Sequence, residues 1–515
     1  MSPKDRRLIE VMFPLERVSA ESRREKNIRH GHISTLHIWW ARRPLSASRA
    51  IALAALLPDP GTEEGRRKLA ELITRIAPWE AVRDGDSPAI QEARRLVREA
   101  FAGEPPRVLD PFAGGGAIPL EALRLGCETH ALDYNPVAVL LLKAVVELPQ
   151  RFGRPQATTE STALGLESSA KESPLVLEVR RWGEWVLEGA REELNGFYPP
   201  DPDGAVPVGY LWARTIPCQN PTCKAEIPLM RQTWLARKRD KKVALRMVPD
   251  RENCRVDFQL VEEEGIDFDP GKGTVARAVV ECPVCGSRID ADTTRRLFRE
   301  GKSGQRMVAV VLHTPSRPLP RKRGRAGAGG KHYRLATERD LAAYRAAEVA
   351  LEERRERLLA DWGFDPVPDE PLPPLETLGF RVQRYGMTRW GDLFNARQKL
   401  ALITFADHVR KAHRRMLTED LPPEFAKAVT TFLALVLNKL ADYSSVQCVW
   451  HTSKELIAHT FGRQTLQTVW DYIEVNPLSG STGDWRSALE WVLEVIAHCS
   501  RIPPVEVEGW NGNPT

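Results

Sequence analysis

The pattern of apolar and polar residues in the first third of the chain predicts helices and short buried strands. Residues 45–57 are densely apolar and follow Pro44, which suits the first turn of a helix. Residues 107–110 form a short apolar run that ends in an acid, and residues 117–125 have helical spacing. A second short strand is predicted over 129–133. This order of strand, loop, helix and strand is typical of an α/β fold.

The remainder of the chain alternates between strand-like and helix-like patterns. Strands are predicted at 242–248, 256–261 and 274–280, and helices at 336–362, 398–416 and 423–441. Thr337 is a suitable N-cap for the first of these helices. We therefore predict an α/β protein with an inserted β ribbon and a mainly helical C-terminal region. The expected segments are 1–160 (N-terminal α/β part), 161–205 (helical linker), 206–315 (ribbon), 316–375 (basic loop, helix and Pro-rich connector) and 376–515 (helical region).

Composition narrows the class of protein only slightly. The 515 residues predict two to four domains, and the formal net charge of +5 does not by itself indicate nucleic acid. No apolar run is long enough for a membrane helix, and the N-terminus lacks the pattern of a signal peptide. Eight cysteines are too few for a disulfide scaffold. These observations predict a cytoplasmic protein without a membrane partner.

The loop after the first strand carries candidate binding chemistry. It reads Asp110-Pro-Phe-Ala-Gly-Gly-Gly116, and its glycines allow a ligand to approach the backbone closely. Asp133 lies about 20 residues further on, where an acid can accept hydrogen bonds from ribose hydroxyls. The loop lacks the G-x-G-x-x-G spacing of dinucleotide enzymes, and a carboxylate entering it repels pyrophosphate. It attracts a sulfonium cation, so S-adenosylmethionine fits better than NAD.

The segment before the first apolar helix has an unusual composition. Residues 28–43 contain three histidines, two adjacent tryptophans and the pair Arg42-Arg43. Stacking rings beside fixed positive charge suit a polar aromatic ligand or a phosphate. The alternative is that Trp39 and Trp40 are core anchors and that the arginines are solvated.

Several of these stretches resemble a known family. DPFAGGG (110–116) and LDYNPVA (132–138) resemble the cofactor motifs of Rossmann-like amino-methyltransferases that use S-adenosylmethionine. HIWWARRPL (37–45) narrows the resemblance to large adenine-specific DNA methylases that have an N-terminal domain of unknown function and an inserted zinc ribbon. The resemblance continues through the cysteine segment and through YGMTRWGDLFNARQ (385–398), AHTFGRQ (458–464) and VWDYIEVNPLSGSTG (469–483).

This resemblance implies a fold, an activity and a set of cofactor residues. The fold it implies is α/β, with an incomplete Rossmann-like methyltransferase cofactor half over residues 1–160, an inserted β zinc ribbon and a mainly helical C-terminal region. Methyl transfer to the exocyclic amine of adenine in DNA, as part of restriction-modification or host defence, is the expected function. The loop residues would surround the methionine end of the cofactor, Asp133 would hold the ribose, and the residues after it would flank the adenine. The residues concerned are Asp110, Phe112, Ala113, Gly114, Gly116, Asp133, Asn135 and Pro136.

Four cysteines occur in two short-spaced pairs. Cys218 and Cys223 are separated by four residues, and Cys282-Pro-Val-Cys285 is followed by glycine, as in a zinc knuckle. Four thiolates form a closed tetrahedral set, so we predict a structural Zn²⁺. Cys254 is a fifth candidate, but it lacks a close partner and is expected to pack as a small hydrophobic residue. A redox pair at Cys282 and Cys285 is the alternative, although no thioredoxin-like context surrounds it.

Two basic stretches flank the predicted ribbon, at 231–242 and 317–331. Clusters of cations bind phosphate backbones without sequence preference. We therefore predict DNA as a partner. The candidate contacts are Arg237, Lys238, Arg239, Arg321, Lys322 and Arg323.

The chain lacks a recognisable catalytic loop. Enzymes of this class use Asp/Asn-Pro-Pro-Tyr/Phe to bind a flipped base and its amine. Asn476-Pro-Leu, Leu421-Pro-Pro-Glu and Ile502-Pro-Pro-Val each lack an essential member, so the catalytic residues stay unknown. We expect a split or truncated enzyme that needs a second polypeptide carrying the catalytic half. The alternatives are a non-catalytic zinc-ribbon protein that binds nucleic acid and keeps a relic cofactor fold, and an RNA or protein methyltransferase.

Overall fold

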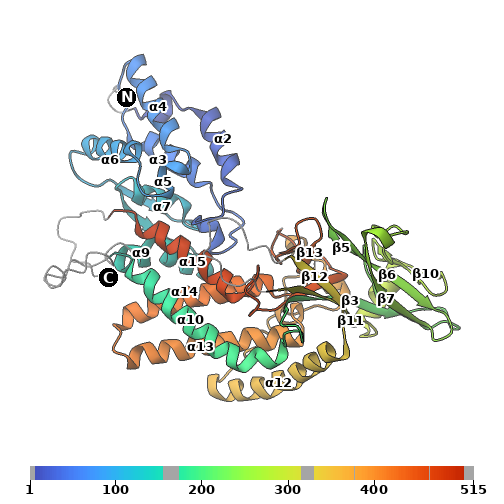
Figure 1. The fold of residues 1–515 in the computed structure, drawn as a ribbon. Helices are drawn as coiled ribbons and strands as arrows, with labels where there is room; N and C mark the ends of the chain where they lie inside the picture. The colour runs from blue at the N-terminus through green and yellow to red at the C-terminus, as the bar shows by residue number, and fades with distance from the viewer. Residues whose placement is uncertain (1–5, 155–172, 315–329, 376, 463, 504–515) are drawn as a thin grey trace. The chain divides into compact units, whose positions relative to one another are not determined.

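The structure is a computed structural model that describes residues 6–154, 173–314 and 330–503, except residues 376 and 463 (Figure 1). It has a mixed α/β fold, as the sequence predicts at this level. The chain forms two compact units. Unit 1 comprises Met1–Trp185, Lys411–Val436 and Leu489–Thr515, and unit 2 comprises Val186–Arg410 and Leu437–Ala488. None of the helices in the described ranges is both long and apolar enough to span a membrane.

Unit 1 is mainly helical and contains one small parallel sheet. Its helices are α1 (Leu8–Val11), α2 (Leu15–Glu25), α3 (Leu45–Leu56), α4 (Glu63–Ile76), α5 (Glu80–Arg83), α6 (Pro88–Ala100), α7 (Ala117–Arg124), α8 (Pro136–Leu142) and α9 (Leu148–Phe152). Its strands are β1 (Arg107–Asp110) and β2 (Glu128–Ala131). Residues of four further helices are divided between the units: α10 (Pro174–Leu194), α13 (Ala396–Thr418), α14 (Pro423–Tyr443) and α15 (Trp485–Ser500).

The strand, glycine loop, helix and strand predicted from the sequence are present in unit 1. Strands β1 and β2 pair in parallel, with Val108 opposite Thr129 and Asp110 opposite Ala131. In the described residues this sheet has only these two strands. The predicted helix at 45–57 is also confirmed as α3, which packs against α7 (Figure 1).

A buried ion pair joins α3 to α7. Arg49 and Glu121 are 1% and 0% exposed, and Arg49 Nη1 lies 2.7 Å from Glu121 Oε2. Arg49 also donates hydrogen bonds to the carbonyl oxygens of Ile76 and Ala77. A second buried arginine, Arg124, lies 3.3 Å from the same carboxylate oxygen. Charges removed from water are costly unless they are paired, so these contacts hold the helix that follows the glycine loop in place.

Unit 2 contains most of the strands. They are β3 (Val206–Pro217), β4 (Glu226–Leu229), β5 (Trp234–Arg237), β6 (Lys242–Asp250), β7 (Arg255–Glu262), β8 (Val275–Ala276), β9 (Val279–Glu281), β10 (Arg288–Ile289), β11 (Gly304–His313), β12 (Lys331–Leu335), β13 (Val449–His451), β14 (Leu456–Ala458) and β15 (Asp471–Val475). Its own helices include α11 (Ala291–Arg299) and α12 (Glu338–Trp362).

The central strand of unit 2 is β3, whose residues are almost all buried. Strand β11 pairs with it on one edge, while β15 and β4 pair with successive parts of the other edge, all antiparallel. Two further sheets have the orders β5-β6-β7 and β10-β9-β8. The predicted strands at 242–248 and 256–261 are confirmed. The single strand predicted at 274–280 is instead a tight hairpin, because the backbone turns at Arg277 and Ala278 with positive φ angles.

Two of the stretches that carry the family resemblance meet in a buried polar network. Arg397 Nε lies 2.6 Å from Glu474 Oε1, and both side chains are fully buried. Asn395 Nδ2 and Trp212 Nε1 donate to the other carboxylate oxygen at 3.0 and 2.7 Å. The guanidinium carbon also lies 4.0 Å from the ring centroid of Tyr210. Residues 385–398 and 469–483 therefore include groups that fix α13 against the central sheet.

Removing the charge of Arg397 should destabilise unit 2 strongly. Arg397→Met leaves Glu474 buried without a counter-ion, and a loss of about 3–5 kcal/mol in the free energy of unfolding is expected from urea titration. The double variant Arg397→Met/Glu474→Gln removes both charges and keeps an acceptor for the Trp212 indole. It should be clearly more stable than the single variant. Equal stability of the two variants would contradict this account.

Candidate functional site

The glycine loop is closed by hydrogen bonds between the ends of β1 and β2. Leu132 N donates to Asp110 O, and Ala113 N donates to Leu132 O, both at 2.9 Å. Asp110 Oδ1 accepts a weaker bond from Phe112 N at 3.2 Å. The loop is therefore held against the segment that follows β2, and the residues that the resemblance assigns to a cofactor lie together at one end of the parallel sheet.

Asp133 is the residue that links these segments most directly. Its carboxylate accepts hydrogen bonds from Gly114 N and from Asn135 N, each at 2.8 Å. These backbone donors lower the pKa of Asp133, so the group is ionised at neutral pH. Asp133 and Asp110 are both half-buried. Two carboxylates thus flank the loop and make it a favourable environment for a cation.

The glycines of the loop are required by a protein side chain. At Gly114, where φ is +53°, a Cβ atom would lie 2.6 Å from Trp39 Nε1, and at Gly115 a Cβ would lie 3.3 Å from Trp39 Cβ. Gly116 has φ +81° and is approached by Val145. Close approach of a ligand, the reason inferred from the sequence, is therefore not needed to explain them. Sequence reasoning missed this contact, although the unusual segment 28–43 contained its partner.

The two tryptophans of that segment have different environments. Trp39 is half-buried against the glycine loop, whereas Trp40 is 42% exposed. One ring therefore packs against the protein and the other is exposed, and the ligand expected for this segment stays a prediction. Arg42 and Arg43 are exposed and form no ion pair with another described residue. A small cavity of about 20 Å³ is lined by Trp39, both arginines and Gly115.

A buried carboxylate holds this segment in place. Glu25 Oε1 lies 2.9 Å from His32 Nε2, and Glu25 accepts the backbone amides of Leu45 and Ser46 at the start of α3. Burial alone would raise the pKa of Glu25, but the hydrogen bonds from His32 and Ser46 lower it to about 2. The chain between His32 and Leu45, which carries Trp39, is therefore anchored at both ends.

Asn135 and Pro136 occupy standard positions at the start of a helix. Asn135 Oδ1 accepts Val137 N at 2.9 Å as the N-cap of α8, and Pro136 is its first residue. Helix capping therefore accounts for both residues without a ligand. Phe112 and Tyr134 beside them are 85% and 101% exposed.

The four paired cysteines come together in unit 2. Their sulfur atoms all lie within 4.8 Å of one another, with Cys218 and Cys285 3.6 Å apart and Cys223 and Cys282 3.9 Å apart. A tetrahedral zinc ion with Zn–S bonds of about 2.3 Å places its sulfur atoms about 3.8 Å apart. All eight cysteines of the chain are free. The cluster could therefore hold a metal ion such as zinc, and Cys254 is not part of it.

Two tight turns present these thiols. Cys218 N donates to Ala225 O at 2.8 Å after β3, and Cys282 N donates to Ser287 O at 2.9 Å after β9. Burial raises the pKa of Cys218 to about 12, whereas hydrogen bonding with Ser287 lowers the pKa of the exposed Cys285 to about 6. Binding of a metal at this cluster must therefore release protons, and its affinity falls on acidification.

The basic residues predicted to contact DNA have different environments. Lys238 forms an ion pair with Glu455, which Lys241 and Tyr333 also contact, so it is engaged within the protein. Arg237 lies over the ring of Trp234 at 5.7 Å from its centroid. Arg239 is exposed and has no ion pair among the described residues. Arg321, Lys322 and Arg323 lie outside the described residues.

Comparison with known proteins adds one match. A family described as a protein of unknown function (DUF1156) matches residues 12–75, which include α2, α3 and the segment with Trp39. No curated protein and no solved structure matches the chain.

The role of Glu25 can be tested through the pH dependence of stability. A folded-state pKa of about 2, against 4.5 for the unfolded chain, means that its contribution is complete above about pH 4.5 and is lost as the pH falls toward 2. Glu25→Gln should cost about 3 kcal/mol in the free energy of unfolding at pH 7 and roughly half of that at pH 3. Glu16→Gln, on the exposed face of the same helix, is the control. A pH-independent loss at Glu25 would contradict this assignment.

The metal site can be tested by elemental analysis. The purified protein should contain one zinc ion per chain, and Cys223→Ser should lower this content and the thermal midpoint together. Cys254→Ser should leave both unchanged. Chelation should make four additional thiols reactive. Full zinc content in Cys223→Ser, or its loss in Cys254→Ser, would show that the ligands are assigned wrongly.

Proposed function

We propose that this protein is the cofactor-binding part of an S-adenosylmethionine-dependent DNA methyltransferase that acts on the exocyclic amine of adenine. The observation that carries this proposal is the position of Asp133, whose carboxylate accepts hydrogen bonds both from Gly114 N in the glycine loop and from Asn135 N. It stands beside a second carboxylate, Asp110, and both remain partly accessible. Such a site suits a ribose and a neighbouring positive charge.

The residues at this end of the sheet would bind and orient the cofactor. S-adenosylmethionine supplies the methyl group on a sulfonium, so the protein needs to contribute orientation and electrostatics and no covalent nucleophile. Asp133 would accept hydrogen bonds from the ribose hydroxyls, and Asp110 would attract the positive charge. The exposed ring of Tyr134, next to Asp133, offers a surface on which the adenine could stack.

A second polypeptide carrying the catalytic loop would complete this sheet. Two parallel strands are fewer than an independently stable sheet needs. Leu109, Phe112, Leu132 and Tyr134 lie in or next to β1 and β2 and are all more than half exposed. Further strands added at this sheet would cover such side chains. Asn476, from the nearest motif candidate, is buried and bonded to Pro207 O and Leu478 N, which leaves it no catalytic role.

A non-catalytic protein that keeps a relic of the cofactor fold is the second candidate. The observation in its favour is Trp39, which packs closely on Gly114 and Gly115. A protein side chain there serves the stability of the loop and does not require a ligand. The two candidates differ in whether the outer face of the loop binds S-adenosylmethionine.

Calorimetry with S-adenosylmethionine separates these candidates. The intact chain should bind it, and Asp133→Ala should weaken binding about 10- to 100-fold because a charge-assisted hydrogen bond is lost. Glu104→Ala, an exposed carboxylate before β1, should bind normally. Absence of binding to the intact chain would favour the relic. Competition between DNA and RNA duplexes for binding to the protein would distinguish a DNA substrate from an RNA substrate.

A further inference from the structure

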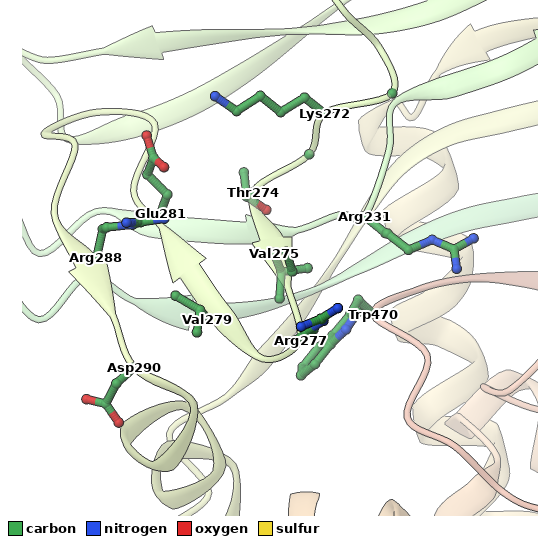
Figure 2. A pocket seen from close by; sticks show the side chains of 13 residues that line it. Arg231, Lys272, Thr274, Val275, Arg277, Val279, Glu281, Arg288, Asp290 and Trp470 are labelled. Carbon is green, nitrogen blue, oxygen red and sulfur yellow. The ribbon is translucent and has the colours of Figure 1, made fainter.

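Unit 2 contains a large open pocket beside the four-cysteine cluster. Its volume is about 1030 Å³, and its walls come from the β8–β9 hairpin, β10, the loop at 271–273 and Trp470 (Figure 2). Cys282 follows β9 directly. The pocket therefore uses β9 and β10, the two strands that flank the turn with Cys282 and Cys285.

Basic side chains outnumber acidic ones in the lining. Arg231, Lys272, Arg277 and Arg288 all line the pocket and are exposed, and none forms an ion pair with another residue in the described ranges. The carboxylates of the lining are Glu281 and Asp290. Other cations of this unit, such as Lys238, are paired with acids. A set of unpaired cations around one concave surface is the electrostatic signature of a site for phosphate groups.

An aromatic ring and an apolar floor accompany these charges. In Figure 2 the side chains of Val275 and Val279 lie between Arg288 and Arg277. Trp470 is half-buried, and its ring is held edge-on by Tyr385 at a centroid distance of 5.2 Å and an interplanar angle of 90°. A ring fixed in this way offers a preorganised surface for stacking, with little entropy to lose when a flat ligand binds.

The backbone positions one of the cations at an energetic cost. Arg277 and Ala278 form the two-residue turn between β8 and β9, with φ values of +51° and +68°. Glycine or asparagine is the usual residue in such a turn, and a long side chain there is strained. This turn places Arg277 at the tip of the hairpin, where its side chain lines the pocket.

We propose that this pocket binds an unpaired stretch of nucleic acid, with phosphates contacting Lys272, Arg277 and Arg288 and a base stacking on Trp470. Cations that follow a backbone, combined with an exposed ring, are the means by which proteins bind single strands without reading their sequence. A duplex offers phosphates but keeps its bases stacked on one another. The pocket therefore discriminates between unpaired and paired strands through Trp470.

This inference deepens the proposed function and rests on it for the choice of nucleic acid as the ligand. It assigns a surface made mainly of residues outside the predicted basic stretch at 231–242, from which Arg231 alone lines the pocket. A strand bound here would be an unpaired part of the substrate next to the metal cluster. Its residues are distinct from those of the candidate cofactor site, so the two can be tested separately.

The charge contribution is tested with a labelled 12-nucleotide single strand and the full chain, by fluorescence anisotropy over a range of salt concentrations. Lys272→Ser/Arg277→Ser should weaken binding at least tenfold and reduce the slope of log K against log salt by about 1.4, because two phosphate contacts are lost. The matched control is Arg251→Ser/Arg299→Ser, which removes the same charge from exposed sites outside the lining. Equal losses in the two double variants would overturn the proposal.

The stacking contribution is tested at Trp470. Trp470→Ala should weaken binding of the single strand about fivefold or more, Trp470→Phe should retain most of it, and binding of a duplex of equal length should change little. Zinc content and thermal midpoint are measured for each variant to show that it folds. If Trp470→Ala does not fold, the result for Lys272→Ser/Arg277→Ser tests the proposal. The assignment to unpaired nucleic acid would be overturned if Trp470→Ala weakened binding of the single strand and of the duplex equally. It would also be overturned if polyglutamate of equal charge displaced the single strand.

Failure of this inference is distinguishable from failure of the proposed function. The pocket variants should bind S-adenosylmethionine normally, and Asp133→Ala should bind the single strand normally. Strand binding that depends on the pocket, in a protein that does not bind the cofactor, would leave this inference standing and remove the methyltransferase assignment. Cofactor binding without pocket-dependent strand binding would contradict this inference and leave the methyltransferase assignment standing.

Discussion

Each unit depends on an arginine–glutamate pair that is removed from water. In unit 1 the pair Arg49–Glu121 joins the helix after the Trp39 segment to the helix after the glycine loop. In unit 2 the pair Arg397–Glu474 fixes α13 to the strand that follows Trp470 closely. Buried charges tolerate few alternative arrangements, because each lost contact leaves an uncompensated charge. Both candidate sites are therefore short turns supported from within by rigid polar contacts.

Local patterns predicted the elements of unit 1 and the metal cluster well. Strand, glycine loop, helix and strand follow from apolar periodicity and from residues with special backbone freedom, which are properties of neighbouring positions. The spacing of Cys218, Cys223, Cys282 and Cys285 likewise indicated a common site, although 58 residues separate the two pairs. The strand expected at 274–280 was wrong because its turn has no glycine, asparagine or proline to mark it.

Long-range contacts could not be predicted from the sequence. The packing of Trp39 on Gly114 joins segments that no periodicity connects, so the glycines were explained by ligand approach alone. The stretches that contain Arg397 and Glu474 carry the family resemblance, but nothing in their sequence showed that these two side chains pair with each other inside the protein. Lys238 was predicted to contact DNA from its charge, but a distant acid, Glu455, pairs with it. In each case the sequence did not reveal which distant residue of the same chain contacts the side chain.

The central claim is that the carboxylates beside the glycine loop hold a sulfonium nucleoside. A crystal structure of the protein soaked with S-adenosylmethionine tests this claim most directly. The account predicts an adenosyl group at the end of the parallel sheet, with its ribose hydroxyls within hydrogen-bonding distance of Asp133. An empty site at saturating ligand, or ligand bound elsewhere while Trp39 and the loop remain unchanged, would contradict it.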